Sequence, residues 1–100
     1  AAVNREASAL RSVMVLAGSF PGEPEARLRT LLRSYIEETT SQEWPLMAEG
    51  AATLTIIPPA LNEALRTTLA LTPTNPGQEI AQREMTRWLE DALEARRQRI

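Results

Sequence analysis

The sequence predicts an all-α protein, a four-helix antiparallel bundle whose helices run up, down, up and down. Three observations support this fold class. Alanine and leucine are plentiful while only 4% of the residues are aromatic, and this composition favours helices over sheets. Four separate segments carry apolar residues at spacings of three and four. Prolines and glycines lie between these segments and indicate short turns, so consecutive helices should pack side by side.

The first helix is predicted over residues 1–17, because Gly18 and the following "SFPGEPE" are typical of a turn. The second should begin at Pro24, since proline fits the first turn of a helix at no hydrogen-bond cost. Its pattern continues to Trp44. There we expect an end or a kink, because Pro45 disfavours a helical conformation at the residue before it.

The third helix is predicted to begin at the two prolines 58 and 59 and to end near Leu69. The fourth should run from about Pro76 to the end of the chain, after the turn residues of "TPTNPGQ". Residues 46–58 are the longest connection. Leu54, Ile56 and Ile57 fit either an apolar extended link or the end of a helix that continues from Pro45.

Each predicted helix has one apolar stripe that should face the core. In the first helix, Arg5, Glu6 and Arg11 lie mostly outside the stripe. Met85 and Trp88 are read as core residues of the fourth helix and not as a cofactor site. The stripes comprise Val3, Ala7, Leu10, Val13, Met14 and Ala17; Leu28, Leu31, Leu32, Tyr35, Ile36 and Thr39; Leu61, Ala64, Leu65, Thr68 and Leu69; and Ile80, Ala81, Met85, Trp88, Leu89, Ala92 and Leu93.

Length and composition restrict the function. One hundred residues form a single domain, residues 1–100. A net charge of -2 argues against binding to nucleic acid, which requires a concentrated basic field. The chain has no cysteine, histidine or lysine. Disulfides, thiolate metal sites, Schiff-base chemistry and the Glu-x-x-His pairs of di-metal bundles are therefore excluded. No cofactor, metal or small-molecule substrate is expected, and the chain is not expected to be an enzyme.

The predicted topology brings distant polar residues to one end of the bundle. With an even number of helices, both chain ends and the end of the second helix lie at the same pole. The residues expected to meet there are Glu6, Glu43, Trp44, Pro45, Arg96 and Arg97.

Three interpretations of this polar joint remain open. In the first, Trp44 covers the end of the core, and Glu6 or Glu43 lies within salt-bridge reach of Arg96 or Arg97. In the second, the arginines bind an anion or a lipid headgroup. In the third, paired carboxylates perform acid–base catalysis. Adjacent acids on a helix, however, diverge by about 100° and cannot share one proton, which argues against the third.

Three stretches of the chain resemble a known family. They are "REASAL", "LRTLLRSYIEETTSQEWPLM" and "LEDALEARRQRI", in this order. Together they are similar to the segment outside the membrane in the bestrophin-like family of bacterial and plant proteins, a domain of unknown function. The most specific pieces are the spacing from Tyr35 to Trp44-Pro45 and the terminal Arg-Arg-x-Arg run, while residues 51–79 match in pattern only. The resemblance implies two transmembrane helices on each side of this segment.

The resemblance leads to a functional expectation. The chain should be a non-enzymatic extramembrane domain of a channel-like membrane protein, held to the membrane through flanking spans. Its start without methionine and its end inside a helical pattern fit a piece cut from a longer protein. The terminal arginines predict that the pole faces the cytoplasm at the inner membrane, by the positive-inside tendency. The alternative is a soluble helical module for protein–protein interaction or self-association.

Overall fold

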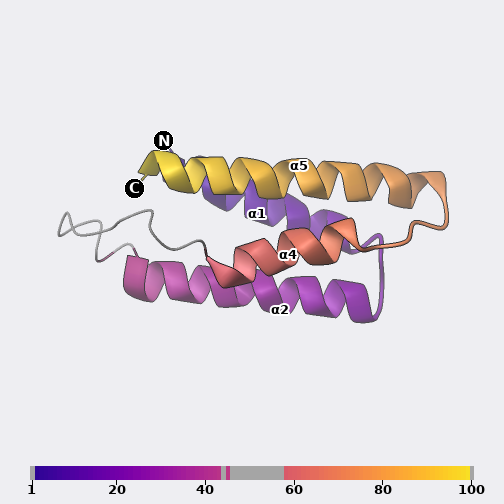
Figure 1. The fold of residues 1–100 in the computed structure, drawn as a ribbon, viewed down its shortest axis with the longest axis horizontal. Coiled ribbons are helices and arrows are strands. Elements are labelled where there is room, and N and C mark those ends of the chain that lie inside the picture. Colours follow the sequence, from indigo (N-terminus) through magenta and orange to yellow (C-terminus); the bar gives the residue numbers. More distant parts are fainter. Residues whose placement is uncertain (1, 44, 46–57, 100) are drawn as a thin grey trace.

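The computed structural model describes residues 2–43, 45 and 58–99, and these form a bundle of four α-helices (Figure 1). Helix α1 spans Ala2–Ala17, α2 spans Glu23–Glu38, α4 spans Pro59–Leu69 and α5 spans Pro76–Arg99. A short π-helix, η1, continues α2 over Thr39–Glu43. The described residues contain no strand. The predicted fold class and the four predicted helices are confirmed.

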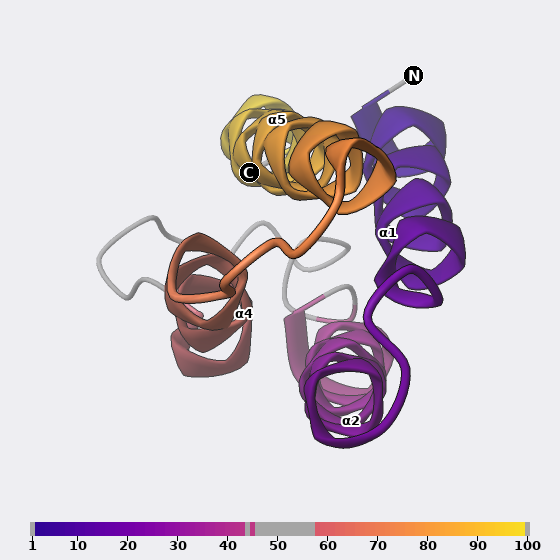
Figure 2. The same cartoon turned by 90° about the vertical axis from the view of Figure 1, so that its right-hand side faces the viewer.

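The helices form a ring in which each packs against its neighbours in sequence, and α5 closes the ring against α1. Viewed along the bundle, α5, α1, α2 and α4 follow one another around a common axis (Figure 2). Both chain ends lie at one end of the bundle, where η1 also ends (Figure 1). This is the arrangement that an up-down-up-down topology requires.

Local sequence explains where the helices start. Gly22 has a φ of 95°, a left-handed conformation that favours glycine, and it turns the chain into α2. Pro24 and Pro59 occupy first-turn positions of α2 and α4. At the start of α5, the Gln78 N–H donates to Asn75 Oδ1 at 2.9 Å, and the Thr74 N–H donates to Gln78 Oε1 at 2.8 Å. This is a reciprocal cap that satisfies two free donors.

Two glutamines of α5 fix the turns at the opposite end of the bundle. Gln78 Nε2 donates to the Ser19 carbonyl at 2.9 Å, which ties α5 to the turn between α1 and α2. Gln82 Nε2 donates to the carbonyls of Thr68 and Leu71, at 3.0 and 2.9 Å. These bonds tie α5 to the last turn of α4 and to the turn that follows it. The Thr68 carbonyl also accepts from the Leu71 N–H at 3.2 Å.

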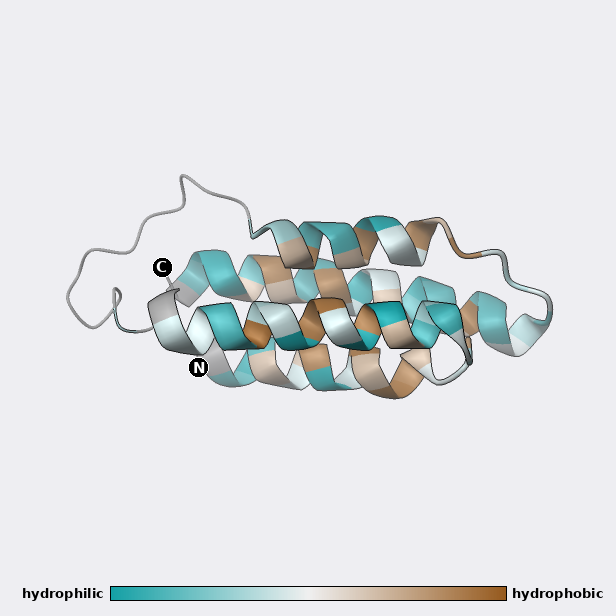
Figure 3. Cartoon of the chain, turned by 90° about the horizontal axis from the view of Figure 1, so that it is seen from below, coloured by the Kyte–Doolittle hydropathy of each residue, from teal (hydrophilic) through white to brown (hydrophobic). Residues whose placement is uncertain are grey.

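The apolar residues meet in one core. Hydropathy alternates around each helix, so that every helix has an apolar and a polar side (Figure 3). The largest fully buried side chains come from all four helices: Val13, Leu28, Leu32, Tyr35, Leu61, Thr68, Met85 and Leu89. Trp88 is half-buried and packs against this core, as predicted for a core residue.

Parts of the predicted stripes are wrong. In α1 Leu10, Val13 and Ala17 are buried as predicted, but Glu6 is buried and Ala7 is exposed. Ile36, Leu69 and Ile80 were placed in stripes but are 39%, 60% and 56% exposed. The physical reason is that Ile36, Leu69 and Ile80 lie at the edges of their stripes at 100° per residue, where the buried side of a helix meets its polar side.

Candidate functional site

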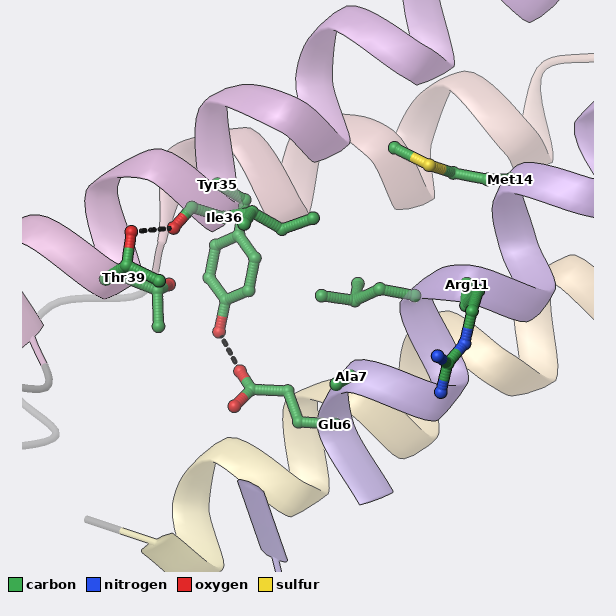
Figure 4. Close-up of a pocket in the computed structure, with 9 residues that line it drawn as sticks. Glu6, Ala7, Arg11, Met14, Tyr35, Ile36 and Thr39 are labelled. Carbon is green, nitrogen blue, oxygen red and sulfur yellow. Dashed lines mark hydrogen bonds between the residues drawn. The ribbon is translucent and has the colours of Figure 1, made fainter. Parts of the chain in front are cut away.

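The start of α1 and the end of α2 face one another across a cleft near the pole where the chain ends lie. The cleft has a volume of about 240 Å³. Nine residues line it, and Figure 4 shows how they lie. They are Glu6, Ala7, Leu10, Arg11, Met14, Tyr35, Ile36, Thr39 and Thr40.

A buried pair of polar side chains lies at one side of this cleft. The Tyr35 hydroxyl donates a hydrogen bond to Glu6 Oε2 (Figure 4). Tyr35 is 1% exposed and Glu6 is 2% exposed. A carboxylate is costly to bury without partners, and a hydrogen bond from a phenol offsets part of that cost. The bond therefore links α1 to α2 at the side of the cleft.

The cleft lies beside the place where α2 changes into a π-helix. The backbone N–H of Thr39 points to the carbonyls of both Ile36 and Tyr35 at this junction. The next two hydroxyls satisfy carbonyls of the last turn. Thr40 Oγ1 donates to the Ile36 carbonyl at 2.9 Å, and Ser41 Oγ donates to the Glu37 carbonyl at 2.7 Å. Single π-turns are rare and occur frequently at functional sites.

Thr39 differs from its neighbours. Its side chain is only 4% exposed, and its Oγ1 has no hydrogen-bond partner. A buried hydroxyl without a partner costs about 1–3 kcal/mol. The Thr39 hydroxyl is therefore a donor and acceptor without a partner, and it is shielded from water although Thr39 lines the cleft.

The predicted polar joint is described only in part. Glu6 is buried against Tyr35, and Arg96 is 6% exposed near the end of α5. Arg97 NH1 lies 2.9 Å from Glu94 Oε2 on its own helix. Pro45 is exposed. The backbone of Glu43 ends η1, while its side chain and all of Trp44 lie outside the described residues. The predicted burial of Trp44 and the predicted salt bridge of this joint stay predictions.

Another arginine crosses between the first and last helices at the same pole. Arg5 NH2 lies 3.2 Å from Asp91 Oδ1, and Arg5 NH1 donates to Gln98 Oε1 at 2.7 Å. This connection was not among the predicted contacts. Both partners are more than a third exposed, so the pair contributes orientation more than stability.

Sequence reasoning missed the Glu6–Tyr35 pair and the unpaired hydroxyl of Thr39. The sequence does contain a pattern that indicates the burial of Glu6. Glu6 precedes Ala9, Leu10, Val13 and Ala17 at helical spacings of three, four, seven and eleven, so it shares the face that is buried. The state of the Thr39 hydroxyl depends on a side-chain rotamer that no sequence pattern reports.

In the described part of the chain, no group of three acidic side chains is placed to hold a metal ion. Within the same ranges, none of the helices combines the length and the apolar character needed to cross a bilayer.

Comparison with known proteins gives one match. A family model described as a bestrophin-like domain matches residues 1–100. No curated protein and no solved structure matches the chain. Because the family model covers the whole sequence, the chain belongs to the bestrophin-like family, which the resemblance of its three helical stretches also indicated.

Proposed function

We propose that this bestrophin-like chain is a non-enzymatic, extramembrane helical domain of a channel-like protein of the bacterial inner membrane. One observation carries the proposal: a channel-related family matches residues 1–100, and in this segment the first and last helices reach the same pole. A domain inserted between two membrane spans must return its chain to the membrane surface that it left. An even number of antiparallel helices provides that return.

The outer faces of the bundle support a location in water. Arg27 NH2 lies 3.4 Å from Glu63 Oε1 across α2 and α4, and both side chains are more than 40% exposed. Arg29 pairs with Glu25 at 3.1 Å along α2. Charged side chains facing lipid are costly, whereas exposed ion pairs of this kind are ordinary in water.

The charges at the pole support the cytoplasmic side. Arg5, Arg96 and Arg97 all lie in the first or the last turns of the terminal helices. The positive-inside tendency counts basic residues near a span and gives little weight to acids, so the partners Asp91 and Glu94 do not cancel it. Each arginine close to an anionic leaflet contributes on the order of 1 kcal/mol.

A reporter in the turn between α4 and α5 tests this proposal. Green fluorescent protein and alkaline phosphatase would be inserted separately after Thr74 of the full-length protein, in the turn opposite the pole. Fluorescence without phosphatase activity, in the membrane fraction, is the expected result. Phosphatase activity would show the opposite orientation. A full-length protein recovered without membrane association would overturn the extramembrane role itself.

The alternative, a soluble interaction module, has less support. It requires an exposed apolar stripe that a partner could cover. In the described ranges the large exposed apolar side chains are Val15, Ile36, Leu69 and Ile80, one on each of the four helices. Single exposed apolar residues are normal for a soluble surface. The described part of the chain therefore shows no stripe on one helix that would favour this reading.

A further inference from the structure

Buried side chains form the floor of the cleft between α1 and α2, and exposed side chains form its rim. Leu10 and Tyr35 lie on the floor and are 4% and 1% exposed. Ala7 and Arg11 lie on the rim along α1, and Ile36 lies on the rim along α2 (Figure 4). The volume of about 240 Å³ is below the roughly 300–1,000 Å³ of drug-sized pockets. The cleft therefore has room for one short hydrocarbon chain and not for a lipid with two long chains.

The apolar walls of the cleft are elongated along α1. The residues that line it on this helix extend from Glu6 to Met14, which is about 12 Å at a rise of 1.5 Å per residue. Leu10 and Met14 are one helical turn apart, and Ile36 lies across from them on α2. An extended alkyl chain that lies parallel to α1 would contact these three apolar side chains.

The charge on the rim of the cleft is positive. Among the described residues that line the cleft, Arg11 is the only charged one that is exposed. Within the described part of the chain, no hydrogen bond or ion pair engages its guanidinium, whereas Arg5 and Arg29 pair with Asp91 and Glu25. A guanidinium binds a carboxylate through charge-assisted hydrogen bonds. A ligand with an anionic head group therefore fits the rim.

Neighbouring grooves of the bundle lack this combination of an apolar floor and an unopposed positive rim. The groove between α2 and α4 contains Arg66, but Glu23 and Glu63 line it too. The groove between α1 and α5 shares Arg11 with the cleft, but the residues that line it are all exposed or half-buried. An alkyl chain would therefore remove less apolar surface from water in either groove than in the α1–α2 cleft.

We propose that the α1–α2 cleft binds a free single-chain carboxylate, with its alkyl chain against Leu10, Met14 and Ile36 and its carboxylate at Arg11. The carboxylate stays at the exposed rim, so it keeps part of its hydration while it pairs with the guanidinium. The site belongs to the bundle itself, so it goes beyond the proposed membrane role, and its failure would leave that role untouched.

Three probes test the ligand class. The 100-residue chain would be titrated at neutral pH with octanoate, hexanoate and octylammonium, below their micellar concentrations, and the amide shifts of residues 7–14 and 35–40 followed by nuclear magnetic resonance. We expect saturable shifts with octanoate. Hexanoate, which is two methylenes shorter, should bind about tenfold weaker. Octylammonium should bind at least about fivefold weaker than octanoate, because its charge meets the guanidinium.

Three outcomes of these titrations would overturn the proposal. The first is a linear response to octanoate, and the second is equal or tighter binding of octylammonium. The third is a response of the same amides to phosphatidylglycerol vesicles and not to octanoate, which would replace the free carboxylate with a lipid surface.

Two substitutions test the role of Arg11. Arg11→Gln should raise the dissociation constant for octanoate about three- to fivefold and leave that for uncharged 1-octanol unchanged. Arg33→Gln is the matched control, because Arg33 is an exposed arginine of α2 that does not line the cleft. It should leave both constants unchanged. Equal effects of the two substitutions on octanoate would assign the binding to net charge and contradict a contact at Arg11.

A second pair of variants tests the place of binding, because Arg11 also borders the groove between α1 and α5. Ala7→Leu extends an apolar side chain on the rim of the α1–α2 cleft, and Ser8→Leu does so in the other groove. Ala7→Leu should abolish the saturable shifts, Ser8→Leu should preserve them, and the circular-dichroism spectra of both should remain helical. The reverse result, or unchanged binding in both variants, would show that the assignment to this cleft is wrong.

Discussion

Helix α1 has two neighbours, and it packs against them in different ways. It contacts α5 far more extensively than it contacts α2. Most of the buried alanines lie on α1 and α5. They are Ala9 and Ala17 on α1, and Ala81, Ala92 and Ala95 on α5. Small side chains let two helices approach closely. Toward α2, α1 instead presents Glu6, Leu10 and Met14, and a cleft remains. The difference shows how one helix can support a core on one side and leave a site on the other.

The largest expected loss of stability comes from replacing a buried leucine with alanine. The comparison is between Leu89 in the core and Leu10 beside the cleft. Leu89→Ala should reduce the free energy of unfolding by about 2–5 kcal/mol, because Leu89 is fully buried and its loss leaves a cavity. Leu10→Ala should cost less, because the Leu10 side chain already borders the cleft and has fewer contacts to lose. Denaturant unfolding measures both. Equal losses would mean that the cleft is closed in solution.

Removal of the hydroxyl of Tyr35 tests what holds α2 to α1 across the cleft. Tyr35→Phe should reduce the free energy of unfolding by about 1.5–3 kcal/mol, since it removes a hydrogen bond to a buried carboxylate. Glu6→Gln is the control, because its amide oxygen can still accept from the phenol, and it should cost less than Tyr35→Phe. If Tyr35→Phe is neutral in thermal and denaturant unfolding, the pair does not stabilise this interface.

Alanine-to-leucine substitutions at two nearby positions of α1 should change the free energy of unfolding in opposite directions. Ala9 is fully buried, so Ala9→Leu should overpack the core and cost about 1–3 kcal/mol. Ala7 lines the cleft, so Ala7→Leu should fill it and stabilise the protein by about 0.5–1 kcal/mol. Comparison of the two unfolding midpoints measures the contrast directly. A destabilised Ala7→Leu variant would argue against an open cleft.

The helix boundaries and the topology could be predicted from the sequence, because they depend on residue spacing and on turn residues. Gly18, Pro24, Pro59 and Pro76 locate the helix boundaries, because proline and glycine restrict or release the backbone wherever they occur. The meeting of both chain ends at one pole follows from the number of helices. These features are local or topological, and neither requires knowledge of how side chains pack.

The site was harder to predict for a physical reason. A glutamate is normally exposed, so Glu6 was assigned outside the stripe, although its spacing from Leu10 and Val13 places it on the buried face. Tyr35 was correctly predicted to be buried, but its partner comes from another helix, and pairing across helices depends on their rotation. The unpaired Thr39 hydroxyl depends on one χ1 angle.

The measurement that tests the central claim most directly is the stability of Thr39→Val, compared with Thr40→Val. If the Thr39 hydroxyl is buried without a partner, valine removes an unsatisfied group while keeping the shape, and the free energy of unfolding should rise by about 1 kcal/mol. Thr40→Val, which loses exposed bonds, should stay within about 0.5 kcal/mol of the unsubstituted chain. A loss of 1 kcal/mol or more in Thr39→Val would show that the fold already uses this hydroxyl, and would contradict the account of a buried hydroxyl without a partner beside the cleft.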